Sequence, residues 1–209
     1  MATRPYEQRA RAEESEKTRG RIICTVLDQL EESPAEPISI GNVAKESGVA
    51  RSTVYAIFGS RSGLLDQVAR ELEDRSGLPE LIEAGNEPDV RDYIRKGFRL
   101  ASSISATNRE AFRALRSMAQ VDGEPAGKTF GRMEQQRAEA MHDIAARLDE
   151  EGLLREGLSR AEAENMLWVL TSFDSFESLY AGKGMTLEDV GEQLIAMAER
   201  LLYAEPYDV

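Results

Sequence analysis

The sequence predicts an all-α protein of about nine helices arranged in two parts. Apolar residues recur at helical spacing along most of the 209 residues, as in the stripe formed by Ile22, Val26 and Leu30. No segment shows the alternation of apolar and polar residues, rich in β-branched side chains, that is typical of strands. Clusters of glycine and proline, which interrupt helices, separate the periodic segments.

The expected helices of the N-terminal part cover about residues 14–33, 40–47, 51–57 and 61–75. The first must end by Pro34, because proline cannot continue a helix. Ser39 and Ser60 are the expected N-caps of the second and fourth helices. Gly48 and Gly59 follow the second and third helices, where glycine adopts a positive φ at little cost.

The expected helices of the C-terminal part cover about residues 89–105, 108–120, 128–151, 160–181 and 186–203. Gly77, Pro79 and the Gly-Asn-Glu-Pro sequence at 85–88 interrupt the chain before them. We therefore expect two domains, residues 1–75 and residues 76–209.

The net charge of −12 is unevenly distributed. Residues 1–75 hold 11 basic and 13 acidic side chains, whereas residues 76–209 hold 15 and 25. A nearly neutral N-terminal part with local basic clusters still allows contact with phosphates, because counterion release depends on the charges in contact. The acidic C-terminal part is expected to repel nucleic acid.

Several classes of protein are excluded by simple features. One cysteine, Cys24, and one histidine, His142, provide neither a disulfide nor the usual zinc ligand set. The Glu-x-x-His spacing of Glu139 and His142 is found in di-iron bundles, but these need a second copy. The N-terminus has no apolar signal segment, and no apolar run is long enough to span a bilayer. We expect a soluble cytoplasmic protein with no metal, no cofactor and no catalytic motif.

Residues 38–58 have the pattern of a helix-turn-helix. Two short helices are joined by a tight turn at Gly48, and the small Ala44 lies where the helices must approach closely. The spacing of four apolar side chains predicts a shared seam, formed by Val43, Val49, Val54 and Phe58.

The start of the second short helix carries side chains suited to reading DNA. Arg51 can bridge guanine O6 and N7, and Thr53 offers a hydroxyl and a methyl group. The hydroxyls of Ser52 and Tyr55 suit phosphate oxygens. The alternative is a helical hairpin whose polar side only faces water.

The region from Arg21 to about Val68 resembles the tetracycline-repressor (TetR) family of bacterial regulators. The matching motif runs from Ile40 through Val43-Ala44, Gly48-Val49 and Thr53-Val54-Tyr55 to Phe58-x-Ser60-Arg61-x-x-Leu64. The resemblance implies a three-helix DNA-binding domain followed by a helical domain for ligand binding and dimerisation.

The resemblance also implies roles for particular residues. Arg51, Ser52 and Thr53 enter the major groove, and Tyr55 contacts the DNA backbone. Ser39, at the start of one helix, and Arg61, at the start of another, are placed at phosphates, and Ile40, next to Ser39, is also assigned to the DNA-binding surface. Ala50 replaces the capping serine common in the family, and Ala56-Ile57 replaces a larger pair. An arm before the first helix, with Arg4, Arg9, Arg11 and Lys17, either reaches the minor groove or is a disordered tail.

The last two expected helices, residues 160–181 and 186–203, have wide apolar faces that can pair with their copies in a homodimer. Leu187, Val190, Leu194, Met197 and Leu201 form one stripe. The alternative is that these faces are covered within one chain.

The C-terminal part also contains candidates for a mostly apolar ligand pocket. The candidate lining residues are Phe98, Phe112, Arg116, Met118, Met141, His142, Trp168, Phe173 and Phe176. The alternative for each of them is an ordinary place in the core or on the surface.

The resulting hypothesis is a repressor that a small-molecule inducer releases from a near-palindromic operator of double-stranded DNA. The alternative is a helical small-molecule binder or partner-protein adaptor that has lost DNA binding.

Overall fold

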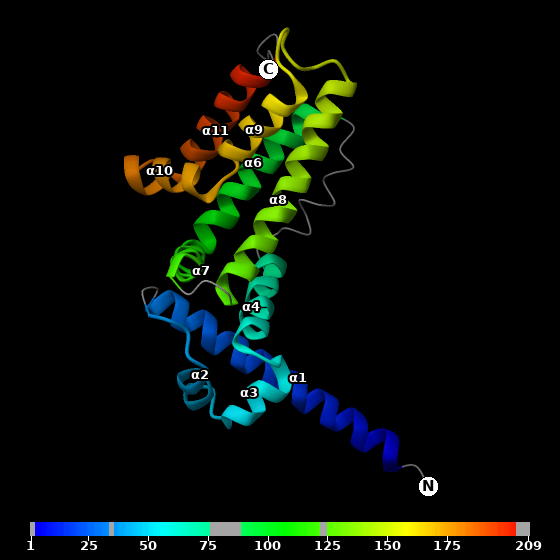
Figure 1. The fold of residues 1–209 in the computed structure, drawn as a ribbon, viewed down its shortest axis with the longest axis vertical. Helices are drawn as coiled ribbons and strands as arrows, with labels where there is room; N and C mark the ends of the chain where they lie inside the picture. Colours follow the sequence, from blue (N-terminus) through cyan, green and yellow to red (C-terminus); the bar gives the residue numbers. More distant parts are fainter. Residues whose placement is uncertain (1–2, 34–35, 76–88, 122–124, 204–209) are drawn as a thin grey trace. The chain divides into compact units, whose positions relative to one another are not determined.

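The computed structural model describes residues 3–33, 36–75, 89–121 and 125–203 (Figure 1). Within these residues it contains ten helices and no strand, and an isolated antiparallel bridge joins Leu154 to Tyr203. The predicted all-α class is confirmed. No helix in the described residues has both the length and the apolar character needed to cross a membrane.

The chain divides into two compact units. Unit 1 comprises Met1–Leu72 and Glu110–Phe130, and unit 2 comprises Glu73–Arg109 and Gly131–Val209. Unit 1 includes residues 110–130 because Ala111, Ala114 and Leu115 are buried in its core. A division of function at residues 75 and 76 stays a prediction.

The helices of unit 1 are α1 (Thr3–Glu32), α2 (Ile40–Glu46), α3 (Arg51–Phe58), α4 (Arg61–Arg75) and most of α7 (Arg109–Val121). The predicted stripe of α1 is confirmed, since Ile22, Val26 and Leu30 are fully buried. The predicted start of this helix near residue 14 is wrong: α1 begins at Thr3, and its N-terminal part extends beyond α2 and α3 (Figure 1). Glu, Gln, Arg and Ala dominate its first half, and these residues have a high intrinsic helix propensity.

The helices of unit 2 are α6 (Val90–Thr107), α8 (Pro125–Glu150) from Gly131 onward, α9 (Arg160–Leu170), α10 (Phe173–Lys183) and α11 (Leu187–Leu202). The helix α11 packs against both α6 and α9. Phe98, Leu167 and Leu194 are among the buried residues of this core.

The single helix predicted over residues 160–181 is wrong, because the chain breaks it at Thr171 and Ser172. Ser172 has extended backbone, with ψ of 148°, and its hydroxyl accepts a hydrogen bond from the Ser175 N–H at 3.2 Å. The Thr171 hydroxyl donates to the Leu167 carbonyl at 2.7 Å. Neighbouring hydroxyls that bond to nearby backbone groups favour a helix end, so one helix finishes here and α10 begins.

Candidate functional site

The two short helices α2 and α3 form the predicted helix-turn-helix. Gly48 has φ of +68°, the left-handed conformation that glycine adopts most easily, and it lets the chain reverse between them. Val43 and Val54 are fully buried, and Val49 packs against the same core. Ala44 is 2% exposed, as expected for a residue at a close approach of two helices. The predicted apolar seam is confirmed.

The opposite face of α3 presents polar side chains to solvent. Arg51 and Ser52 are exposed, Thr53 is half-buried, and the Tyr55 side chain is 51% exposed although it is large and aromatic. The structure thus brings together, on one exposed surface, the four side chains that the sequence predicts for DNA reading.

The Arg51 guanidinium lies against Gly41 in the first turn of α2. A Cβ atom placed on Gly41 would lie 3.0 Å from Arg51 Cζ and 3.1 Å from Nε, and even closer to Nη2. Among the described residues, no carboxylate pairs with Arg51. The charged group therefore remains available to an external partner. The role of Gly41 is not visible in the sequence, because the contact joins two helices.

Two predicted DNA-binding residues stand at the start of α2. Ser39 is exposed and occupies the N-cap position, and its side chain makes no capping hydrogen bond. Ile40 is 8% exposed and belongs to the core of unit 1. Only the Ile40 backbone N–H, one of the first-turn amides that lack a partner within a helix, can serve a phosphate.

Arg61, the other predicted phosphate anchor, also has a structural contact. Its Nε donates to the Ile38 carbonyl at 2.6 Å, which ties the start of α4 to the segment before α2. The preceding Ser60 caps α4 as predicted, accepting from the Gly63 N–H at 3.0 Å.

Gly63 is a structural residue that sequence reasoning missed. A Cβ atom at this position would overlap the Phe58 carbonyl oxygen. The glycine therefore lets the first turn of α4 approach the end of α3. Its place five residues after Phe58 is the only trace of this role in the sequence.

The basic arm is helical and belongs to α1. The Lys17 side chain is exposed, while the side chains of Arg4, Arg9 and Arg11 lie outside the described residues. A minor-groove contact by this arm stays a prediction.

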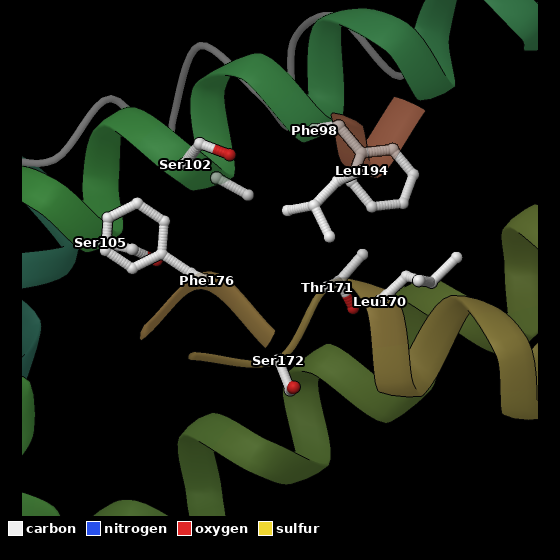
Figure 2. Close-up of a pocket in the computed structure, with 9 residues that line it drawn as sticks. Phe98, Ser102, Ser105, Leu170, Thr171, Ser172, Phe176 and Leu194 are labelled. Carbon is white, nitrogen blue, oxygen red and sulfur yellow. The ribbon is translucent and has the colours of Figure 1, made fainter. Parts of the chain in front are cut away.

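Unit 2 contains a small cavity between α6, the α9–α10 break and α11 (Figure 2). Its walls include Phe98 and Ser102 of α6, Thr171 at the break, Phe176 of α10 and Leu194 of α11. The cavity volume is about 10 Å³, room for about one water molecule. The Ser102 hydroxyl is buried here and has no hydrogen-bond partner among the described residues. The wall contains no charged side chain.

The predicted pocket residues are dispersed. Phe98 and Phe176 line the cavity, and Met141 and Phe173 belong to the surrounding core. Phe112 and Arg116 belong to unit 1, and the Met118 side chain lies outside the described residues. Sequence reasoning missed the hydroxyls of the wall, because serine and threonine at helix ends are ordinary capping residues.

Trp168 and His142 contact polar neighbours outside the cavity. The Arg137 guanidinium stacks on the Trp168 ring at 3.5 Å and donates to the Trp168 carbonyl at 2.6 Å. Arg160 donates to His142 Nε2 at 2.7 Å, so Nδ1 carries the proton and donates to Glu164 at 3.0 Å. The structure gives both residues structural contacts, and their role as ligand contacts stays a prediction.

The apolar stripe of α11 is only partly covered within the chain. Val190 and Leu194 are buried, and Gly191 packs against Arg99 and Ser102 of α6. Three large apolar side chains of α9 and α11 remain exposed: Val169 (58%), Leu187 (38%) and Met197 (37%).

Comparisons with known proteins agree with this architecture. The solved structure of NalD, the secondary repressor of the MexAB-OprM multidrug efflux pump in Pseudomonas aeruginosa, matches with a TM-score of 0.71 and 22% identity, covering 92% of this chain and 99% of NalD. A TetR-family transcriptional regulator from Rhodococcus sp. matches with a TM-score of 0.70 and 17% identity, covering 90% and 99%.

A sequence relative points in the same direction. The HTH-type transcriptional regulator AlkX of Mycobacterium tuberculosis is 29% identical over 121 residues, which cover 56% of this chain and 54% of AlkX. The alignment thus spans about half of the relative. No family model matches the chain. The chain has the fold of TetR-family regulators, and the resemblance seen in its sequence is confirmed.

Proposed function

We propose that this chain is a DNA-binding transcriptional regulator, a repressor that a small-molecule ligand releases from its operator. The observation that carries the proposal is the division of α3 into two faces. Val54 and Phe58 anchor the helix in the core, while Arg51, Ser52 and Tyr55 face solvent. A recognition helix needs this arrangement, because its polar side chains must reach base edges from a rigid support.

A homodimer through α9, α10 and α11 completes the proposal. The exposed Val169, Leu187 and Met197 offer an apolar surface that a second copy can cover. Two copies place two recognition helices in successive major grooves, about 34–36 Å apart on a near-palindrome. A ligand that binds more tightly to a dimer with another spacing lowers operator affinity.

The test starts with DNA selected from a random pool by the unaltered protein, followed by fluorescence anisotropy at several salt concentrations. Arg51→Ala and Tyr55→Ala are each expected to lower affinity by about 1–3 kcal/mol, roughly 5–150-fold. Arg70→Ala, which removes an exposed arginine of α4, serves as the matched control and is expected to change affinity little.

Two results contradict the proposal. One is the absence of salt-sensitive DNA binding, since contacts to phosphates require it. The other is an equal loss from Arg51→Ala and Arg70→Ala, which indicates general charge attraction. Ligand binding without any operator affinity favours the alternative of a helical small-molecule binder that has lost DNA binding.

A further inference from the structure

The contact between Arg51 and Gly41 links the two helices of the helix-turn-helix at their N-terminal ends. Arg51 is the first residue of α3, and Gly41 is the second residue of α2. The guanidinium occupies the space that any other residue at position 41 would fill with its Cβ. The contact exists only because position 41 is glycine.

Glycine at this position has a cost in local stability. Position 41 lies inside a seven-residue helix, where glycine is less favourable than alanine. Its φ is negative, so the backbone does not require glycine for conformational reasons. The described contact at this position is the one with the Arg51 side chain. The physical benefit of the glycine is therefore the room that it leaves for Arg51.

An arginine side chain has many rotamers, and ordering it on binding costs free energy. Packing of the guanidinium against the flat surface over Gly41 restricts those rotamers before DNA arrives. Since no carboxylate among the described residues competes for the charge, the held group remains able to bind a nucleic acid. Preorganisation of this kind raises affinity and defines the direction from which the group meets its partner.

We propose that Gly41 is a positioning residue for DNA recognition: it sets the direction of the Arg51 side chain and so determines which base pair that side chain reads. The inference rests on the proposed DNA-binding function and adds a specificity determinant outside the recognition helix. Any side chain at position 41 displaces the guanidinium from α2. Because the displaced group is the flexible end of a long side chain, the fold adjusts without loss of stability.

The test is a double-mutant cycle with Gly41→Ala, Arg51→Ala and the double variant, measured on the operator selected by the unaltered protein. Gly41→Ala is expected to weaken operator binding several-fold while its melting temperature stays equal or rises. In the Arg51→Ala background, the same change is expected to alter affinity by less than about twofold, since its effect acts through the guanidinium.

A second random-pool selection tests specificity. The sequences chosen by Gly41→Ala are expected to lose preference at the base pairs where Arg51→Ala also loses it, which a merely structural role does not produce. Gly131→Ala is the matched control, because Gly131 lies in α8 and nothing surrounds the position of its Cβ within 4 Å. This control is expected to leave affinity and base preference unchanged.

The outcomes separate the inference from the function on which it rests. Equal losses from Gly41→Ala in both backgrounds, or no loss in either, overturn the role of Gly41 while operator binding stands. If the unaltered protein selects no DNA, the proposed function fails, and the inference fails with it. The NMR signal of the Arg51 Nε–H group, compared between the unaltered protein and Gly41→Ala, shows independently whether the guanidinium has moved.

Discussion

The helix-turn-helix of unit 1 and the cavity of unit 2 are built in opposite ways. The first is formed by about twenty consecutive residues, and the side chains predicted to read DNA lie on the exposed face of one helix. The second is assembled from α6, the end of α9, α10 and α11, whose residues are up to about 100 positions apart in the chain, and its walls are buried or half-buried. Surface function in unit 1 can therefore change without loss of stability, whereas the cavity of unit 2 is part of the core that holds the unit together.

Removal of an aromatic ring from the core of unit 2 tests this contrast most strongly. Phe176 is 2% exposed and stacks on Phe173 and Tyr180, with ring centroids 6.2 and 5.0 Å away. Phe176→Ala is expected to lower the free energy of unfolding by about 3–5 kcal/mol, measured by urea denaturation. Tyr55→Ala, which removes an exposed aromatic side chain of unit 1, is expected to change the free energy of unfolding by less than about 0.5 kcal/mol. Similar losses in both variants contradict the contrast.

Unit 1 is expected not to tolerate substitution at Gly63, where the backbone of α4 contacts that of α3. Gly63→Ala forces a Cβ against the Phe58 carbonyl, and we expect a loss of about 1–3 kcal/mol in thermal or urea unfolding. Gly131→Ala is the control, expected to be neutral or to stabilise by up to about 1 kcal/mol through better helix propensity. An unchanged stability in Gly63→Ala means that α3 and α4 can separate freely, which opposes the close approach described above.

Arg137 of α8 contacts the segment where α9 ends and α10 begins. Arg137 stacks on Trp168 and also donates to the Thr171 hydroxyl at 3.2 Å. Lysine has no planar guanidinium to stack on Trp168 and lacks the rigid fork of N–H donors, so Arg137→Lys is expected to destabilise the protein by about 1–2 kcal/mol.

Trp168 is the only tryptophan of the chain, so its fluorescence spectrum reports directly on the loss of the Arg137 stack. Arg147→Lys is the control: Arg147 lies in α8, as Arg137 does, and pairs with Glu151 just beyond the end of the helix, so the change is expected to cost a few tenths of a kcal/mol. If Arg137→Lys leaves stability and fluorescence unchanged, the contacts of Arg137 with Trp168 and Thr171 do not stabilise the break.

Removal of the buried Ser102 hydroxyl tests whether the cavity of unit 2 is a dry core or a polar site. Because Ser102 Oγ is buried without a partner among the described residues, Ser102→Ala is expected to raise stability by about 1 kcal/mol or less. The measurement is chemical denaturation, with Ser105→Ala, at the half-buried neighbour, as control. A clear loss of stability in Ser102→Ala indicates instead that a bound water or ligand uses the hydroxyl.

The smallest expected effect concerns the N-terminus of α9. The Ser159 hydroxyl and backbone N–H donate to the Glu162 carboxylate at 2.6 and 2.9 Å, and these hydrogen bonds lower the pKa of Glu162. Because the folded pKa lies below the unfolded one, the stabilisation is present at neutral pH and disappears as the pH falls through the folded pKa.

Melting temperatures between pH 7 and pH 3 test this effect. The melting-temperature difference between the unaltered protein and Glu162→Gln is expected to shrink as the pH falls. A difference that stays constant with pH contradicts a contribution from the charge of Glu162.

The helix-turn-helix was predictable because its signals are local. Apolar spacing, the glycine of the turn and the polar start of α3 all lie within 21 residues, and each has a short-range physical meaning. The pocket prediction rested on no local signal of this kind. Phe98 and Phe176 line the cavity, whereas Phe112 and Arg116 lie in unit 1. Apolar residues on a helix can pack in any hydrophobic core, so residue type alone does not show which of them are in contact.

The sequence by itself determined the helical class, the place of the helix-turn-helix and the side chains on its exposed face, because periodicity and turn chemistry act over a few residues. Only the tertiary structure decided which helices join which unit, where Gly41 and Gly63 allow close approach, and which hydroxyls of unit 2 are buried without a partner among the described residues. These features depend on contacts between different helices, whether near or distant in the chain, and such contacts leave no periodic trace in the sequence.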